Sequence, residues 1–152
     1  MNILFFLTPK SEVAYVYDDD TLRQVIEKVD YHKYTAIPML NRSGKYVGTV
    51  TEGDLLRYIK SRYTLTLKDA EETSIKDVPL RWKDDTIDIN CNMEDLIGVA
   101  MKQNFVPVVD DCDNFIGIIR RSEIIHYCYN KYKVAAEECQ KNCKEMCEGR
   151  PT

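Results

Sequence analysis

Short apolar runs alternate with polar turns along this chain, and the pattern predicts a mixture of strands and helices. Residues 12–17 and 36–40 are rich in β-branched, aromatic and other apolar side chains, which is typical of strands. A turn over 41–45 contains Asn, Ser and Gly, and a second apolar run follows over 46–50. Residues 36–50 are therefore predicted to form a β-hairpin.

Helices are predicted on both sides of this hairpin. Before it, four apolar residues fall on one helical face: Leu22, Val25, Ile26 and Val29. Thr21 and Gln24 have the spacing of a capping box, which marks the start of that helix. Its end is expected near residues 31–33. After the hairpin, a second helix is predicted to run to about residue 62, with three side chains facing inward: Leu55, Leu56 and Ile59.

The hairpin pattern returns 69 residues later. Residues 104–123 repeat it without a gap, so that Pro107 matches Pro38 and Gly117 matches Gly48. The apolar face of the first helix recurs at an offset of 71, which indicates a short insertion in the first copy around residues 31–33. An internal repeat of this size predicts two similar half-units that complete one core.

We therefore expect an α+β fold in three parts. These are a first repeat over 1–65, a linker and second repeat over 66–130, and a C-terminal helical extension over 131–152. A short helical turn is expected over 74–79 and a long last helix over about 122–147. In that helix five residues are spaced alternately by four and three positions: Tyr132, Ala136, Cys139, Cys143 and Met146. This seam predicts packing on a neighbour, such as a second copy in a homodimer.

Composition narrows the class of protein. The chain has 152 residues, 44% of them hydrophobic and 30% charged, with a net charge of −4. These values are ordinary for a globular protein, and the acidic balance argues against non-specific nucleic-acid binding. No apolar run approaches the ~20 residues of a membrane span. The first ten residues lack a signal peptide's basic flank, and the six cysteines are expected to stay reduced. We expect a cytoplasmic location.

Three groups of motifs give the chain a family likeness. They are Tyr-Thr-Ala-Ile-Pro at 34–38, Gly-Thr-Val-Thr-Glu-Gly-Asp at 48–54, and Phe-Val-Pro-Val-Val at 105–109 with Phe-Ile-Gly-Ile-Ile at 115–119. With the motifs in this order, the chain resembles a tandem pair of CBS domains, the cystathionine-β-synthase-type module, over about residues 5–130. The resemblance implies two β-α-β-β-α units packed sheet to sheet about a pseudo-two-fold axis. It also implies an adenine nucleotide in the cleft between them, and dimers that form a flat disc.

Thr51 and Asp54 are the first candidates for contacts with such a nucleotide. They stand where the second hairpin strand ends and a helix begins, and a carboxylate there can accept hydrogen bonds from both hydroxyls of a ribose. The resemblance implies that Asp54 holds the ribose and that Thr51 meets ribose or phosphate. The alternative is that both residues only cap the helix.

The resemblance adds further residues around the base and the phosphates. Thr35, Ala36 and Ile37 would border the adenine, next to Tyr34 and Pro38, although a plain core strand is the alternative. Tyr34 would either stack on the base or cover the core edge. The lead-in residues reach the same cleft in the family: Thr8, Pro9 and Lys10. Lys10 would neutralise phosphate or be an ordinary surface lysine.

The second copy departs from the family pattern. Arg120 and Arg121 replace Thr51 and Glu52, and Glu123 replaces Asp54. A guanidinium fork matches phosphate oxygens, so one hypothesis is a phosphate clamp formed by the two arginines. The other is a pair of exposed or salt-bridged arginines at a helix start. The clamp also suggests cyclic di-AMP as an alternative ligand.

The remaining chemistry is sparse. Trp82 either stacks on a purine or lies in a core, and His32 and His126 are interpreted as surface or structural residues. Cys139, Cys143 and Cys147 lie on one helical face, and we interpret them as packing residues rather than a metal site. Without a catalytic motif, we expect no enzyme and no catalytic cofactor. The hypothesis is a sensor of AMP, ADP or ATP that relays its state to an unknown regulated protein; the alternative is a structural dimerisation module without ligand.

Overall fold

The computed structural model describes residues 2–62, 64–81 and 83–149. Its α-helices are α1 Leu22–His32, α2 Glu52–Ser61, α3 Leu67–Glu72, α4 Met93–Ala100 and α5 Arg121–Glu148. Its strands are β1 Leu7–Pro9, β2 Val16–Tyr17, β3 Ala36–Leu40, β4 Tyr46–Thr51, β5 Ile87–Asp88, β6 Phe105–Val109 and β7 Phe115–Arg120. Three 3₁₀ turns complete it: η1 Ile3–Phe6, η2 Lys10–Glu12 and η3 Ile75–Asp77.

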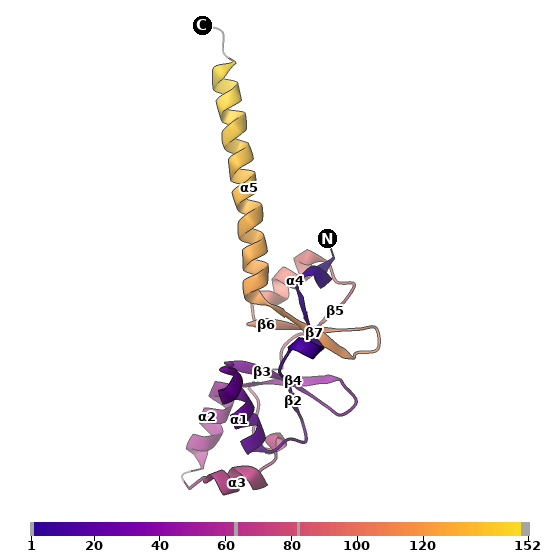
Figure 1. Cartoon of the computed structure of the whole chain (residues 1–152), viewed down its shortest axis with the longest axis vertical. Coiled ribbons are helices and arrows are strands. Elements are labelled where there is room, and N and C mark those ends of the chain that lie inside the picture. Colours follow the sequence, from indigo (N-terminus) through magenta and orange to yellow (C-terminus); the bar gives the residue numbers. More distant parts are fainter. Residues whose placement is uncertain (1, 63, 82, 150–152) are drawn as a thin grey trace.

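The strands form two small sheets that face each other (Figure 1). One sheet has the order β2-β3-β4 and the other β1-β7-β6-β5. In both, a short strand pairs parallel with the first strand of an antiparallel hairpin. The register shifts at the same place in each hairpin, between Met39 and Leu40 and between Val108 and Val109. The predicted repeat is therefore confirmed down to a local irregularity of the backbone.

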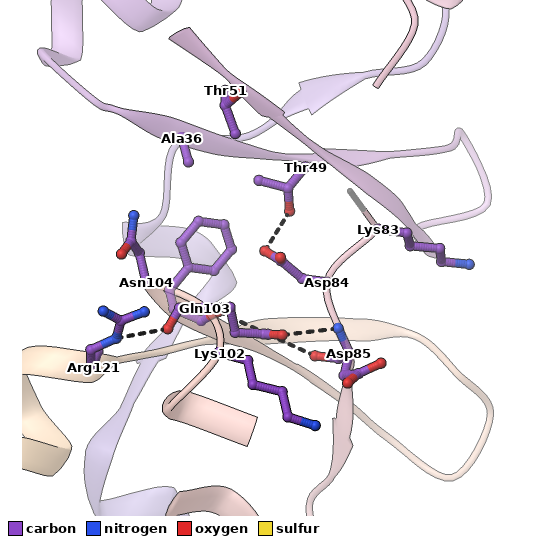
Figure 2. A pocket seen from close by; sticks show the side chains of 11 residues that line it. Ala36, Thr49, Thr51, Lys83, Asp84, Asp85, Lys102, Gln103, Asn104 and Arg121 are labelled. Carbon is purple, nitrogen blue, oxygen red and sulfur yellow. Dashed lines mark hydrogen bonds between the residues drawn. The ribbon is translucent and has the colours of Figure 1, made fainter. Parts of the chain in front are cut away.

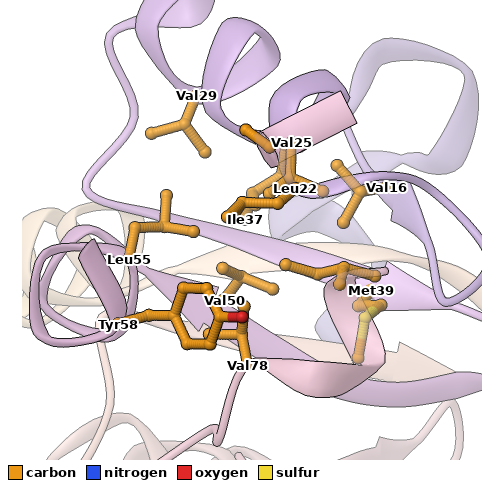
Figure 3. Close-up of a cluster of buried hydrophobic side chains, with 12 residues drawn as sticks. Val16, Leu22, Val25, Val29, Ile37, Met39, Val50, Leu55, Tyr58 and Val78 are labelled. Carbon is orange, nitrogen blue, oxygen red and sulfur yellow. The ribbon is translucent and has the colours of Figure 1, made fainter. Parts of the chain in front are cut away.

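Each sheet is covered on its outer face by helices, and each half has its own core. In the first half, α1, α2 and the linker enclose buried side chains such as Leu22, Ile37 and Val50 (Figure 3). Leu96, Val106 and Ile119 belong to the corresponding cluster of the second half. A third buried cluster joins residues of both repeats: Val13, Leu40, Tyr46, Phe105, Phe115 and Ile118. The expected α+β fold with sheet-to-sheet packing is confirmed.

The N-terminal segment packs with the second half of the molecule. Strand β1 pairs antiparallel with β7, and Pro9 lies opposite Gly117. A Cβ atom on Gly117 would lie 2.2 Å from the carbonyl oxygen of Thr8, so a side chain there is incompatible with this pairing. The strand predicted over 12–17 is shorter than expected. Residues 10–12 form a 3₁₀ turn, and Val13 is drawn into the cluster between the sheets.

Local sequence signals explain most of the helix boundaries. Helix α1 begins with the predicted capping box of Thr21 and Gln24, and it ends at His32, followed by the C-cap residue Lys33, whose φ of 55° is left-handed. Helix α3 was not predicted, although Thr66 and Asp69 form a capping box at its start. Two of the three side chains expected to face inward from α2 are exposed, Leu56 at 67% and Ile59 at 39%, whereas Leu55 is buried.

Helix α5 begins and ends within one residue of its predicted bounds. Its 28 residues give it a length of about 42 Å. Figure 1 shows that only its first turns contact the second half of the molecule, and that the rest projects away from both sheets. Near its base, Tyr127 packs edge-on against Phe6 of the N-terminal turn, with ring centroids 5.2 Å apart.

Candidate functional site

Two cavities lie at the interface of the two repeats and are related by the internal repeat. The first, which we name the Thr49 cavity, has a volume of about 490 Å³, and the second, the Tyr34 cavity, about 460 Å³. Residues 36, 49 and 51 line the Thr49 cavity, and their counterparts in the second repeat, 69 positions later at 105, 118 and 120, line the Tyr34 cavity. Four residues line both: Ala36, Asn104, Phe105 and Arg121.

A chain of hydrogen bonds crosses the Thr49 cavity from one repeat to the other, and Figure 2 shows its bond between Thr49 and Asp84. Thr49 donates to the Asp84 carboxylate at 3.0 Å, so its oxygen accepts the proton of the Tyr46 hydroxyl at 2.6 Å. The Asp84 backbone N–H donates to the same Tyr46 oxygen at 3.2 Å. Burial raises the pKa of Tyr46 to about 12. Burial also raises the pKa of Asp84 above its usual value, against the opposing effect of the Thr49 hydrogen bond.

Gln103 and Arg121 fix the floor of the same cavity. The Gln103 amide donates to the carbonyls of Asp85 and Phe105, at 2.8 and 3.0 Å, and accepts from the Asp85 N–H at 3.1 Å. Arg121 donates through Nε to the carbonyls of Ala100 and Gln103, both at 3.0 Å. These carbonyls lie at and just beyond the C-terminus of α4, where a cation is favourable. The Arg121 side chain is thus oriented by backbone oxygens rather than by a carboxylate.

The Tyr34 cavity has different chemistry. Its walls are largely apolar or aromatic, and its charged lining residues are Lys33, Arg120 and Arg121. No carboxylate is among the residues that line it. Arg120 is exposed, and Tyr34 stacks on His32 with ring centroids 5.3 Å apart. This cavity therefore offers a largely apolar lining with three positively charged residues.

The Thr51–Asp54 corner forms a helix cap. The Thr51 hydroxyl accepts from the Asp54 N–H at 3.1 Å, and the Asp54 carboxylate accepts from the Thr51 N–H at 3.0 Å. The same carboxylate pairs with Arg57 at 2.5 Å and accepts from the Arg81 N–H at 3.2 Å. It is 1% exposed. Thr51 lines the Thr49 cavity, whereas Asp54 lines a separate hollow of about 380 Å³ beside α2.

The predicted site residues are thus divided among several places. Six of them gather around the Tyr34 cavity: Tyr34, Thr35, Ala36, Pro38, Arg120 and Arg121. Ile37 is fully buried in the first core. Thr8 and Pro9 lie in β1 against β7, and Lys10 lies over the Tyr15 ring at 5.4 Å, so these three line neither inter-repeat cavity.

The remaining candidate residues lie apart from both cavities or outside the described residues. Glu123 is exposed on the first turn of α5. Trp82 lies outside the described residues. Cys139, Cys143 and Cys147 are free and exposed, and the described part of the chain contains no group of three His, Cys, Asp or Glu side chains placed to hold a metal.

Sequence reasoning missed the polar residues of the Thr49 cavity. Thr49 belongs to a strand that the sequence pattern identifies only as part of the hairpin, while Asp84 precedes β5 and Gln103 precedes β6. Tyr46 does not line the cavity but hydrogen-bonds to Thr49. The repeat itself carried a usable signal. Gln103 corresponds to Tyr34 at the offset of 69, so choosing Tyr34 as a candidate in the first copy also indicates Gln103 in the second.

Comparison with known proteins places this arrangement in a family. The family model of the CBS domain matches twice, over residues 6–61 and 71–130. The chain belongs to the CBS domain family. Among curated proteins, the uncharacterized protein MJ1426 of Methanocaldococcus jannaschii is 28% identical over 139 residues, covering 72% of this chain and 82% of the relative.

Solved structures support the same fold. CbpB in complex with c-di-AMP superposes with a TM-score of 0.76 at 23% identity, covering 91% of each chain. CBSX2 in complex with AMP superposes with a TM-score of 0.68 at 20% identity, covering 86% of this chain and 98% of the other.

Among the described residues of this CBS protein, no helix combines the length and apolar character that crossing a membrane requires.

Proposed function

We propose that this CBS pair is a regulatory, non-catalytic module that binds an adenine nucleotide between its two repeats. The observation that carries the proposal is the Tyr34 cavity, where a largely apolar lining lies beside Arg120 and Arg121. The base would lie between the two sheets, and the phosphates would face the two guanidinium groups. The c-di-AMP and AMP complexes of the similar folds support this ligand class.

The physical character of the cavity supports an anionic, flat ligand. Its volume of about 460 Å³ falls within the ~300–1,000 Å³ of typical small-molecule sites. Guanidinium groups bind phosphate oxygens through paired, charge-assisted hydrogen bonds. The Thr49 cavity is less suited to phosphate, since the carboxylates of Asp84 and Asp85 offset the charge of its three cationic lining residues, Lys83, Lys102 and Arg121.

The ribose contact of Asp54 remains part of the proposal as a second arrangement. A nucleotide in the Thr49 cavity would have Thr51 at its border. To reach that ribose, the Asp54 carboxylate would have to release Arg57 and the Arg81 N–H. Hydrogen bonds to charged groups contribute ~1.5–3 kcal/mol, so this exchange requires compensation from the ligand. We therefore place the stronger site in the Tyr34 cavity.

Binding between the sheets gives the module a way to signal. A ligand shifts a conformational equilibrium only as far as it binds two states with different affinity. A nucleotide that contacts Tyr34 in one repeat and Arg120 in the other would favour one relative placement of the two sheets. A partner protein, or the second subunit of a homodimer, would respond to that placement.

Cyclic di-AMP is the second candidate ligand. It is favoured by the shared lining, because Ala36, Asn104, Phe105 and Arg121 border both cavities. A ligand with two bases and two phosphates would contact both sides of these residues. Such a ligand would bind with one molecule per chain.

Calorimetric titration of the chain with AMP, ADP, ATP and c-di-AMP tests the proposal. At least one is expected to bind, and Arg120→Ala should weaken it by ~10–100-fold, the loss of one charge-assisted phosphate contact. The matched control is Lys68→Ala on α3, which removes an exposed cation far from both cavities and should leave affinity unchanged.

Two results would contradict the proposal at different levels. If none of the four nucleotides binds at millimolar concentration, the structural dimerisation module becomes the better account. If Asp54→Asn weakens binding while Arg120→Ala does not, a nucleotide does bind, but in the Thr49 cavity.

A further inference from the structure

The nucleotide site leaves helix α5 unexplained. Among its 28 residues Ile124 is buried, and most of the helix stands clear of both sheets (Figure 1). Helices in water derive most of their stability from packing an apolar face. A helix this long and this exposed therefore requires a surface that covers it.

The seam predicted from the sequence is longer in the structure. It begins at Ile125 and continues through Tyr129, so that seven residues alternate in spacings of four and three: Ile125, Tyr129, Tyr132, Ala136, Cys139, Cys143 and Met146. Four of the larger side chains are mostly exposed, Ile125 at 59%, Tyr129 at 58%, Tyr132 at 72% and Met146 at 70%. Three heptads of exposed apolar residues indicate a helix–helix contact.

Charge is concentrated on the opposite side of the helix. Residues 125–148 contain eight charged side chains, and seven of them lie outside the seam and its two flanking rows; Lys133 is the exception. A solvated helix would carry charge on all sides. The segregation therefore supports a covered face.

The seam continues into a groove at the base of the helix. This groove, between α4 and α5, has a volume of about 460 Å³ and is lined mainly by apolar side chains, including Met101, Ile125 and Tyr129. Met101 is 78% exposed at its edge. An occupant of the seam would therefore also meet this groove.

We propose that the occupant is the α5 helix of a second copy, packed antiparallel about a two-fold axis near residues 137 and 138. In this register Ala136 faces Cys139 of the partner, Tyr132 faces Cys143, and Tyr129 faces Met146. The partner's distal end then reaches the groove at the base. The same surface is used by both copies, as a two-fold interface requires.

Side-chain size favours the antiparallel register over the parallel one. A parallel, in-register pair would set Tyr132 against Tyr132 and Ala136 against Ala136 in adjacent layers. The two helices would then need different separations one turn apart. The antiparallel pair instead sets Tyr132 against the smaller Cys143, so the separation stays more even.

The area is consistent with a stable dimer. Two tyrosines in each copy, exposed at 58% and 72%, would together bury roughly 400–600 Å². Met101, Ile125 and Met146 from both copies bring the total towards the ~1,200 Å² at which stable interfaces begin.

Sedimentation equilibrium of the full chain tests whether the seam forms a dimer. The wild type should be dimeric, and Tyr132→Glu should weaken the dimer by ~100-fold or more, because each dimer loses two buried tyrosines. The control is Val134→Glu, which places the same charge on the outer side, where Val134 is 54% exposed; it should leave the dimer intact. A monomeric wild type, or a Tyr132→Glu variant that still dimerises, would overturn the proposal.

Cysteine cross-linking tests the register. In a chain whose other cysteines are Ser, Ala136→Cys with Cys139 should form an intermolecular disulfide. Cys143 alone should not, since the two copies of Cys143 would lie ~16 Å apart along the axis. Cross-linking through Cys143 alone would establish a parallel pair and reject the proposal. Nucleotide binding by the Tyr132→Glu monomer is a separate readout, so failure of this interface is distinguishable from failure of the nucleotide site.

Discussion

Replacing Thr49 by Val tests the hydrogen-bond chain that links the two repeats. Thr49 is 3% exposed, and its hydroxyl accepts from Tyr46 and donates to Asp84. Valine keeps the shape of the side chain but removes both bonds. The Tyr46 hydroxyl, whose residue is 7% exposed, is then left without its acceptor.

The expected loss of stability follows from these contacts. A buried donor without a partner costs ~1–3 kcal/mol, and the bond to the half-exposed Asp84 carboxylate contributes about 1 kcal/mol after screening by solvent. The free energy of unfolding should therefore fall by about 2–4 kcal/mol. For a chain of this length, that lowers the melting temperature by roughly 5–15 °C.

Urea denaturation at pH 7 measures this change, and Thr49→Ser is the control. Serine keeps the hydroxyl and loses one methyl group, so it should cost only about 1 kcal/mol. If Thr49→Val is within 0.5 kcal/mol of the wild type, taken as roughly the scatter of a surface substitution, the network does not hold the repeats together. The same conclusion follows if serine is as damaging as valine.

Two further predictions concern stability. Because burial raises the pKa of Asp84, its charged form costs stability above that pKa. Asp84→Asn should therefore be more stable than the wild type at pH 7.5. This advantage should shrink as pH falls through the raised pKa and be absent below about pH 4, as measured by denaturation at each pH. An Asp84→Asn variant less stable at pH 7.5 would refute this. Gly117→Ala should lower the free energy of unfolding by about 1–3 kcal/mol and expose Leu7–Pro9 to hydrogen exchange, because its Cβ would meet Thr8. The control is Gly98→Ala in α4, where an added Cβ meets nothing within 4 Å, and it should raise the free energy of unfolding by up to ~1 kcal/mol. Equal effects of the two substitutions would contradict the close approach of β1.

The parts of the fold that depend on local pattern were predictable. Thr21 with Gln24 marked the start of α1, and the matched hairpins gave β3, β4, β6 and β7. The pairing of β1 with β7 was not predictable, because it joins residues more than 100 positions apart through backbone contacts, and the only local trace is Gly117. Leu56 and Ile59 were assigned inward from their apolar character, which cannot separate a core face from an exposed one.

The candidate site was predictable only in part, for a related reason. The family motifs identify candidate residues within each repeat separately, whereas each cavity is lined by residues of both repeats. Tyr34 and Arg120, for example, come from different repeats and meet at one cavity. The bonds that occupy Asp54 come from Arg57 and the distant Arg81 backbone, and no sequence motif records them.

A crystal structure of the chain grown with saturating AMP is the most direct test of the central claim. The account predicts the adenine between the two sheets, beside Tyr34 and Phe105, with the phosphate within hydrogen-bond distance of Arg120 or Arg121. A nucleotide bound on the outer helices, or two empty cavities under conditions where calorimetry shows binding, would contradict it.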